Sequence, residues 1–509
     1  MTRKPQPAAR EAPPRSYGLP IAYGVFVVLV VAVSPTLDLP AAPIAGLLAL
    51  ATIVYALRKR IYSWRFLLFS VLAMIMFVPA RAYALPVPLP FQLEPYRVLW
   101  IIGLGVVLWA VFVRGSLRWR QTMIRPGLLF YLFTILVSFA FNASELTRKG
   151  LINGAVGGIV TFLMLLVPLV IVRQLLDSES IVKRVLVFLT WSAATVSLFA
   201  LFEYATRINV FRTYAYFLPL HLLRDELEAT TTIGAFRAFG SAQHPIALVV
   251  MLATLIPAAI WLANWSDWPK NPINRRIFYG VITLILFAGM MSAISRTAVV
   301  VLASMFAVVL LLRPRVASLL AVLSIPPLIL VALVRPNVFN TVFLSFLDLD
   351  NLVASQYTSP GWAGQGRLAD IGPALEIVAQ QPFFGSALGS RIVVGENANS
   401  FILDNQWLAI LMELGILGVV GLALFILTPA VLLIKHAHTP GVPASHRDLA
   451  IAVATATIGY AVAMYFFDAF SFIQSFLVLS MLWAVGGWLL TDAAREGEWV
   501  ATRGVGAAL

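Results

Sequence analysis

Apolar segments of about 17 to 25 residues recur along the whole chain, and they restrict its fold more than any other feature. As a helix, such a segment crosses about 30 Å of hydrocarbon. Hydrophobic residues make up 60% of the 509-residue chain and charged residues only 12%, with a mean hydropathy of +0.90. A chain of this composition cannot cover a water-soluble fold with polar surface. We therefore predict an all-α polytopic membrane protein.

The apolar runs predict about 12–14 transmembrane helices. Helices are favoured over barrel strands because the runs are continuous and lack the alternation of a barrel. We count fourteen runs, at residues 18–36, 40–57, 66–83, 97–113, 126–141, 151–172, 185–203, 244–264, 278–294, 297–312, 317–334, 412–434, 449–467 and 474–490.

The positions of Lys and Arg predict the orientation of the chain, since both residues accumulate on cytoplasmic loops. Of the 36 Lys and Arg, 24 fall in alternate gaps between the runs: the N-terminal tail, 58–65, 114–125, 173–184, 265–277, 313–316, 435–448 and the C-terminus. We therefore expect both termini in the cytoplasm, as in a multi-pass protein of the bacterial cytoplasmic membrane. The net charge of +13 suits anionic membrane lipids and gives no signature of nucleic-acid binding.

Two outer segments interrupt the rhythm of short loops, at 204–243 and 335–411. Loops longer than about 15 residues are usually functional or disordered. The second contains RLADIGPALEIVAQQ, in which Leu368, Ile371, Leu375 and Val378 have helical spacing and predict an amphipathic helix over the membrane domain. The predicted organisation is a disordered tail at 1–17, membrane helices at 18–334, the extracytoplasmic loop at 335–411, membrane helices at 412–490 and a cytoplasmic tail at 491–509.

Arg296 stands between two apolar runs, and this topology places it at a tight outer turn. One interpretation is a lipid anchor whose guanidinium reaches the headgroups. The other is a polar site on the outer side, because other ionisable residues also fall at outer ends of runs: Glu203, His244, Glu413 and Asp468. Charges collect at helix ends in any case, so the two interpretations stay open at this point.

Known catalytic motifs do not explain such a site. The sequence has no HExxH, P-loop or GxSxG pattern, no cysteine, and no outer histidine cluster that would bind zinc. We predict neither a metal nor a cofactor. What remains is outer arginines, whose planar guanidinium pairs with phosphate oxygens through two hydrogen bonds. The residues alone thus suggest a diphosphate site.

Four stretches in order resemble the O-antigen ligase and O-antigen polymerase superfamily. The resemblance covers about residues 230 to 430, and the multi-span pattern extends it to most of the chain. The stretches are FRAFGSAQHP (236–245), ISRTAVVVLAS (294–304), GRLADIGPALEIVAQQPFFGSALG (366–389) and DNQWLAILMELGILGVVGL (404–422).

The resemblance implies a fold similar to the C-class lipid-linked glycosyltransferases. Such proteins take a glycan from an undecaprenyl-diphosphate carrier outside the cytoplasmic membrane and pass it to an acceptor. Arg296 and Arg367 match family arginines and would hold the diphosphate, and Arg237 matches a frequent family arginine. With them we group His244 and Asn405 as substrate-binding residues.

Asp404 marks a departure from the family. Ligases carry a His-Asn pair where this chain has Asp404-Asn405, and the resemblance makes that histidine the general base. An aspartate can accept the same proton, so Asp404 is our catalytic candidate together with Arg296 and Arg367. The substitution favours a polymerase, or a ligase for a polymer other than lipid A. A helix N-cap is the alternative role for Asp404.

The expected partners are an undecaprenyl-diphosphate-linked glycan, a glycan, lipid or protein acceptor, membrane lipids and a regulator of chain length. Outer-loop aromatics such as Tyr214 and Tyr216 would stack on sugars or lie at the membrane interface. The alternative function is a flippase or exporter of the same lipid-linked glycans, which would not require the large outer loop. A scaffold for envelope assembly is a third interpretation, which leaves the outer arginines unexplained.

Overall fold

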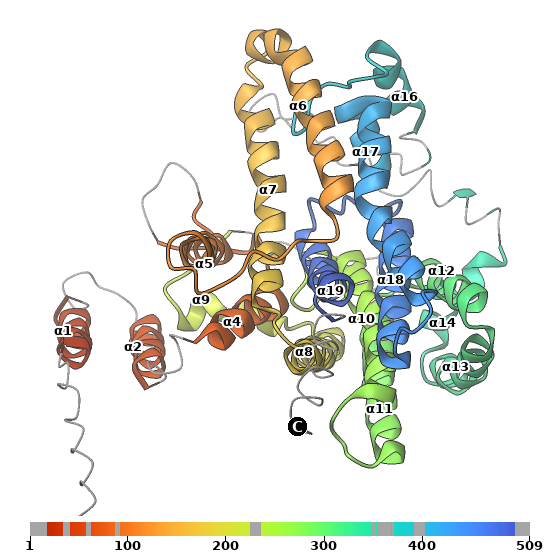
Figure 1. The fold of residues 1–509 in the computed structure, drawn as a ribbon, viewed down its shortest axis with the longest axis horizontal. Helices are drawn as coiled ribbons and strands as arrows, with labels where there is room; N and C mark the ends of the chain where they lie inside the picture. The colour runs from red at the N-terminus through yellow and green to blue at the C-terminus, as the bar shows by residue number, and fades with distance from the viewer. Residues whose placement is uncertain are drawn as a thin grey trace, which may run out of the picture.

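The computed structural model describes residues 18–33, 41–56, 63–86, 92–223, 236–348, 350, 353–354, 368, 371–390 and 403–493, and it is almost entirely helical (Figure 1). Each of the fourteen apolar runs coincides with a helix, which confirms the predicted all-α class. From the N-terminus these helices are α1 (Gly18–Val33), α2 (Ala41–Ala56), α4 (Trp64–Phe77), α5 (Pro95–Phe112), α6 (Arg125–Arg148), α7 (Ile152–Leu175) and α8 (Glu179–Thr206). They continue with α10 (Pro245–Trp265), α11 (Pro272–Ser292), α12 (Thr297–Leu312), α13 (Pro314–Val334), α17 (Gln406–Ala437), α18 (Ala444–Ala463) and α19 (Ile473–Thr491).

The lengths of the helices support a multi-pass membrane protein. Within the described ranges, nine helices have 18 or more residues and are apolar enough to cross a membrane. Shorter apolar helices lie at Ile44–Ile53, Trp64–Phe77 and Thr297–Leu312. At 1.5 Å per residue, the 14 residues of α4 extend about 21 Å, less than the hydrocarbon thickness. The number of spans between nine and fourteen therefore stays a prediction.

Short elements fill the connections between the long helices. The strands β1 (Tyr83–Ala84) and β2 (His221–Leu222) pair antiparallel, with Tyr83 opposite Leu222. This ladder, which the sequence did not predict, ties the connection after α4 to the segment after α8. The remaining short elements are η2 (Val210–Arg212), α9 (Tyr214–Phe217), α14 (Pro336–Val342), η3 (Leu344–Phe346) and α16 (Ile371–Gln380).

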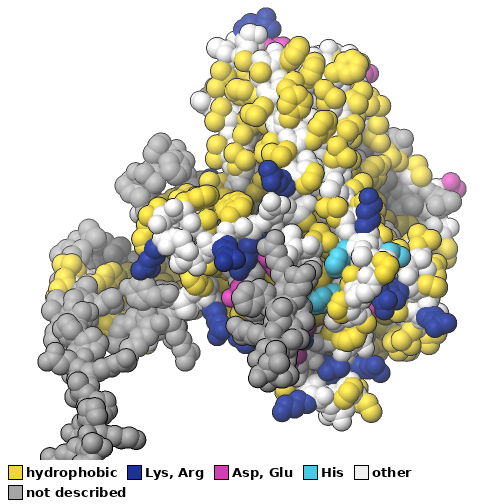
Figure 2. Space-filling model, viewed as in Figure 1, with side chains coloured by type: hydrophobic (Ala, Val, Ile, Leu, Met, Phe, Trp, Pro, Cys, Tyr) yellow, Lys and Arg dark blue, Asp and Glu magenta, His cyan; other side chains and the backbone are white. Residues whose placement is uncertain are grey.

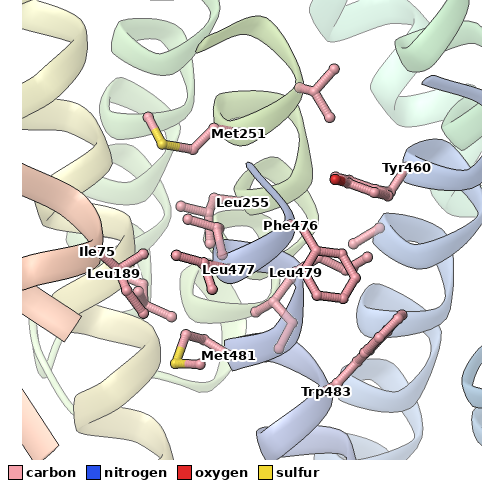
Figure 3. Packing of buried hydrophobic residues seen from close by; sticks show 14 of the residues in the cluster. Ile75, Leu189, Met251, Leu255, Tyr460, Phe476, Leu477, Leu479, Met481 and Trp483 are labelled. Carbon is pink, nitrogen blue, oxygen red and sulfur yellow. The ribbon is translucent and has the colours of Figure 1, made fainter. Parts of the chain in front are cut away.

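The centre of the core is α19, which contacts α4, α7, α10, α17 and α18. Figure 3 shows Phe476, Leu477 and Met481 of α19 among side chains of the surrounding helices. Of its apolar window 94% is buried, against 6% for α13, which lies at the edge of the molecule. The protein therefore encloses α19 on all sides, whereas the exposed apolar surface of α13 is suited to contact with lipid.

Helices α6, α7 and α17 run toward the same end of the molecule, where α16 packs on α17 (Figure 1). Hydrophobic side chains cover much of this part of the visible face, whereas several Lys and Arg gather toward the opposite end, around α11 (Figure 2). A surface of this kind is expected where a protein meets lipid, so the view agrees with a membrane protein.

Candidate functional site

Seven helix ends meet in one region of the structure. Helices α8, α11 and α18 end there, and α10, α12, α17 and α19 begin there. Hydrogen bonds and ring contacts, described below, join the connecting segments to one another. We call this region the polar ring and define it as residues 203–212, 236–244, 292–297, 404–406 and 464–474. Most of the residues that the sequence singled out lie in it.

The segment Phe236–His244 is fixed to the end of α8 by a buried carboxylate. Glu203 is only 1% exposed, and its two oxygens accept the backbone N–H groups of Gly240 (2.7 Å) and Phe239 (3.4 Å). The side-chain nitrogen of Asn209 donates to the carbonyl of Gly240 (2.8 Å). Gly240 has a φ of 55°, a conformation that glycine adopts without strain. Both backbone polar groups of Gly240, its N–H and its carbonyl, are therefore bound.

Arg237 and Arg296 lie on two segments that are bonded to each other. Arg237 Nε donates to the carbonyl of Ala293 (2.9 Å), and the Ala238 N–H donates to the carbonyl of Ser292 (3.1 Å). Ser292 is the last residue of α11 and Ala293 begins the turn to α12, whose N-cap is Arg296. The predicted tight turn at Arg296 is thus present. The fold brings the two arginines to one place, although 59 residues separate them in the sequence.

His244 has two contacts that fix its ring. It is the N-cap of α10, and its Nδ1 accepts the N–H of Ile246 (3.2 Å). The same ring stacks on Phe472, with centroids 5.0 Å apart and planes 28° apart. These contacts give His244 a structural role at the junction of α10 and α19, and its predicted contact with substrate stays a prediction.

Asp404 and Asn405 precede α17 and have different roles. Asn405 is the N-cap, because its Oδ1 accepts the N–H of Leu408 (3.1 Å). The capping role considered for Asp404 therefore belongs to its neighbour. The next residue, Gln406, donates its N–H to the carbonyls of Met464 (2.8 Å) and Phe467 (3.2 Å). Asp404 is thereby fixed at the rim of the 464–472 connection.

Two glutamines extend this network through buried positions. Gln406 Oε1 accepts the N–H of Phe470 (2.8 Å). Gln474, in the first turn of α19 and 1% exposed, donates to Ser241 Oγ (3.1 Å) and to the carbonyl of Ile75 (2.7 Å). Gln474 and Ser241 were not among the residues predicted from the sequence. The available signal was a glutamine within an apolar run, since a buried amide in such a position requires polar partners.

The amphipathic helix expected in the long loop is present as α16. It packs through Ile371, Ala374 and Val378 on the first turns of α17. Of the predicted stripe, Ile371 and Val378 face α17, whereas Leu375 is 47% exposed and Ala374 is fully buried.

The segment after α16 fills a break in α17. Gly415 has φ 67° and ψ −166°, which interrupts the helix. The N–H groups of Ser386 and Ala387 donate to the carbonyls of Met412 (3.1 Å) and Glu413 (2.8 Å). Ile416 N–H donates in turn to the carbonyl of Pro382 (2.9 Å). The inserted segment thus satisfies backbone groups that the break releases.

The outer-loop tyrosines differ in their surroundings. Tyr214 donates its hydroxyl to the carbonyl of Phe77 (3.0 Å) and stacks on Tyr83. Burial, with a smaller effect of Tyr83, raises the pKa of Tyr214 to about 12, so this hydroxyl remains a donor at neutral pH. Tyr214 is therefore part of the scaffold. Tyr216 is 70% exposed and stays a candidate for sugar or lipid contact.

Some predicted residues lie outside the described ranges. Arg367 is one of them, as are residues 391–402 of the long loop and the tail at 1–17. Among the described residues, no three His, Cys, Asp or Glu side chains converge as metal ligands.

The fold defines the class of this chain as an all-α multi-pass membrane protein, and the polar ring joins several of its helix ends by hydrogen bonds. Comparison with protein-family models and with curated proteins finds no match.

Proposed function

We propose that this protein transfers or polymerises glycans from an undecaprenyl-diphosphate carrier at the outer face of the bacterial cytoplasmic membrane. In the proposed orientation both termini are cytoplasmic, so the polar ring faces outward. The observation that supports the proposal most directly is the bond between Arg237 and the turn that carries Arg296. It holds two arginines, residues whose guanidinium groups can form two-pronged bonds with phosphate, on segments bonded to each other.

Helix N-termini in the polar ring offer further groups that favour anions. Four helices begin in it, with N-caps at His244, Arg296, Asn405 and Phe472. A helix N-terminus carries about half a positive charge and unsatisfied N–H groups, which favour anions. The ends of α8, α11 and α18 lie beside them, as does the last turn of α4 through the carbonyl of Ile75. The arginines and the helix N-termini thus both favour an anionic ligand such as a diphosphate.

The proposed reaction is a direct displacement at the anomeric carbon of the donor glycan. The acceptor hydroxyl oxygen forms a bond to this carbon while the bond to the phosphate oxygen breaks, which inverts the configuration. Asp404 takes the proton of the acceptor hydroxyl. The carrier diphosphate leaves with the electron pair, and Arg296, Arg237 and Arg367 stabilise its charge.

A reconstituted assay tests this function. Purified protein in liposomes receives undecaprenyl-diphosphate glycans with EDTA present, and the products are sized by gel electrophoresis and mass spectrometry. We expect longer glycans or a glycan–acceptor adduct, with release of free undecaprenyl diphosphate. Arg296→Ala should lower the rate about 100-fold or more, since it removes a donor to the developing charge. Asp404→Asn should lower it about 100-fold by removing the base.

Arg276→Ala is the matched control. Arg276 is an exposed arginine in the first turns of α11, whereas the polar ring meets the other end of that helix. Its loss should leave the rate within about twofold of wild type. If wild type leaves the glycans chemically unchanged but moves them between leaflets, the transferase is wrong and the flippase takes its place.

A further inference from the structure

We infer that Glu203 is a positioning residue of the polar ring, which holds the segment Phe236–His244 so that Arg237 and the turn before Arg296 stay together. The inference rests on the proposed function in one respect, because it takes the donor diphosphate as the anion that Arg237 and Arg296 bind. Glu203 itself touches no substrate in this arrangement. It acts through the backbone of the segment.

The burial of Glu203 requires a specific set of partners. A carboxylate at 1% exposure is costly unless hydrogen bonds or opposite charges compensate the loss of water. The N–H groups of Phe239 and Gly240 provide the hydrogen bonds. Both N–H groups belong to the segment between α8 and α10, so the carboxylate ties the last turn of α8 to that segment.

The surroundings of Gly240 narrow the position of the segment to one register. Its N–H is bound by Glu203, and its carbonyl is bound by Asn209. The guanidinium of Arg212 lies 5.4 Å from the ring centroid of Phe239, which adds a cation–π contact next to the bound peptide. A shift of the segment by one residue would move Phe239 away from Arg212 and put Phe239 or Ser241 at the positive φ that Gly240 adopts.

This register extends to Arg237, three residues before Gly240. Arg237 and Ala238 bond the carbonyls of Ala293 and Ser292, in the turn that leads into α12 at Arg296. Without Glu203, the segment would lose two of the hydrogen bonds that hold it beside this turn. The expected effect on function is weaker binding of the donor rather than slower chemistry.

Two substitutions test the role of Glu203. Glu203→Leu removes both acceptors, whereas Glu203→Gln keeps one oxygen for the Gly240 N–H and turns an NH₂ group toward Phe239. The proteins are reconstituted as full chains, and hydrogen exchange is followed by mass spectrometry for peptides covering 236–244 and 292–297. We expect about tenfold faster exchange in Glu203→Leu and a smaller change in Glu203→Gln, because local opening becomes easier. In the transferase assay, KM for the donor should rise about tenfold while kcat changes by less than about threefold.

Gln174→Leu controls for a general loss of stability. Gln174 is fully buried near the end of α7, where its side chain bonds the backbone of Arg120 in both directions. It precedes α8, and Glu203 lies near the other end of that helix. The two variants are compared at a similar loss of Tm. If Gln174→Leu then changes KM and the exchange of 236–244 as much as Glu203→Leu does, the positioning role is wrong.

The exchange measurement separates this inference from the proposed function. A wild type that transfers no glycan would contradict the function, yet faster exchange confined to 236–244 and 292–297 in Glu203→Leu would still support the positioning role. Unchanged exchange in Glu203→Leu would overturn that role, whether or not glycan is transferred.

Discussion

At the scale of single residues, the polar ring shows that adjacent polar side chains have separate roles. Asn405 caps α17, and Asp404 beside it is left to other contacts. Gly240 adopts a positive φ while its N–H and its carbonyl are both hydrogen-bonded. Residue type alone did not distinguish these roles, because aspartate and asparagine are about equally good N-caps.

Asn405→Ala tests the assignment of the cap. We expect a loss of about 1 kcal/mol of stability, since the N–H of Leu408 loses its acceptor. The measurement is thermal unfolding in detergent, with Asp404→Ala as the matched neighbour. A larger loss of Tm in Asp404→Ala would show that the cap is assigned to the wrong residue.

At the scale of elements, α17 and the segment Pro382–Ser390 form one unit. The break at Gly415 is compatible with burial because the segment bonds the released backbone groups. Asn142 of α6 also donates to the carbonyl of Gly385 (2.9 Å), so a third element joins the unit. The position of α16, which precedes the segment, therefore depends on this break.

Gly415→Ala should disrupt the unit. The added Cβ would lie 2.3 Å from the carbonyl carbon of Phe383, and the backbone conformation is accessible essentially to glycine alone. We expect a destabilisation of about 2 to 4 kcal/mol in thermal unfolding. Gly157→Ala, where a Cβ meets open space, is the control and should change stability by less than about 1 kcal/mol. Equal Tm values for the two variants would contradict the role of the break.

At the scale of the whole molecule, helix direction places the polar ring on one side of the membrane domain. Helix α8 ends in the ring and α10 begins in it, so the α10–α11 connection lies at the other end of both. Because the chain has no cysteine, single introduced cysteines report their own accessibility. Tyr216 and Lys270 are exposed positions in the α8–α10 and α10–α11 connections.

Cysteine labelling in intact cells tests this orientation. Tyr216→Cys should react with a membrane-impermeant maleimide from outside, whereas Lys270→Cys should react only after permeabilisation, since positive residues favour the cytoplasmic side. Labelling of a denatured sample controls for the presence of both thiols. The reverse pattern would place the polar ring in the cytoplasm and contradict the proposed donor.

The sequence predicted the helices well and the contacts between them poorly. Apolar runs locate helices because length and composition are local properties, and the turn at Arg296 followed from them. The apolar run at 412–434 covers only part of α17, which begins at Gln406 and passes through the break at Gly415. The bond of Gln474 to Ser241 joins residues 233 positions apart, and no local pattern encodes it.

The burial of α19 has a consequence for how the protein is made. During synthesis α4, α7 and α10 enter the membrane long before residues 473–491 leave the ribosome, so the faces that later enclose α19 must first meet lipid or one another. The bundle can close only when this helix arrives. Its insertion is thus a late assembly step, and surveillance by membrane proteases during biogenesis would act on the open bundle that precedes it.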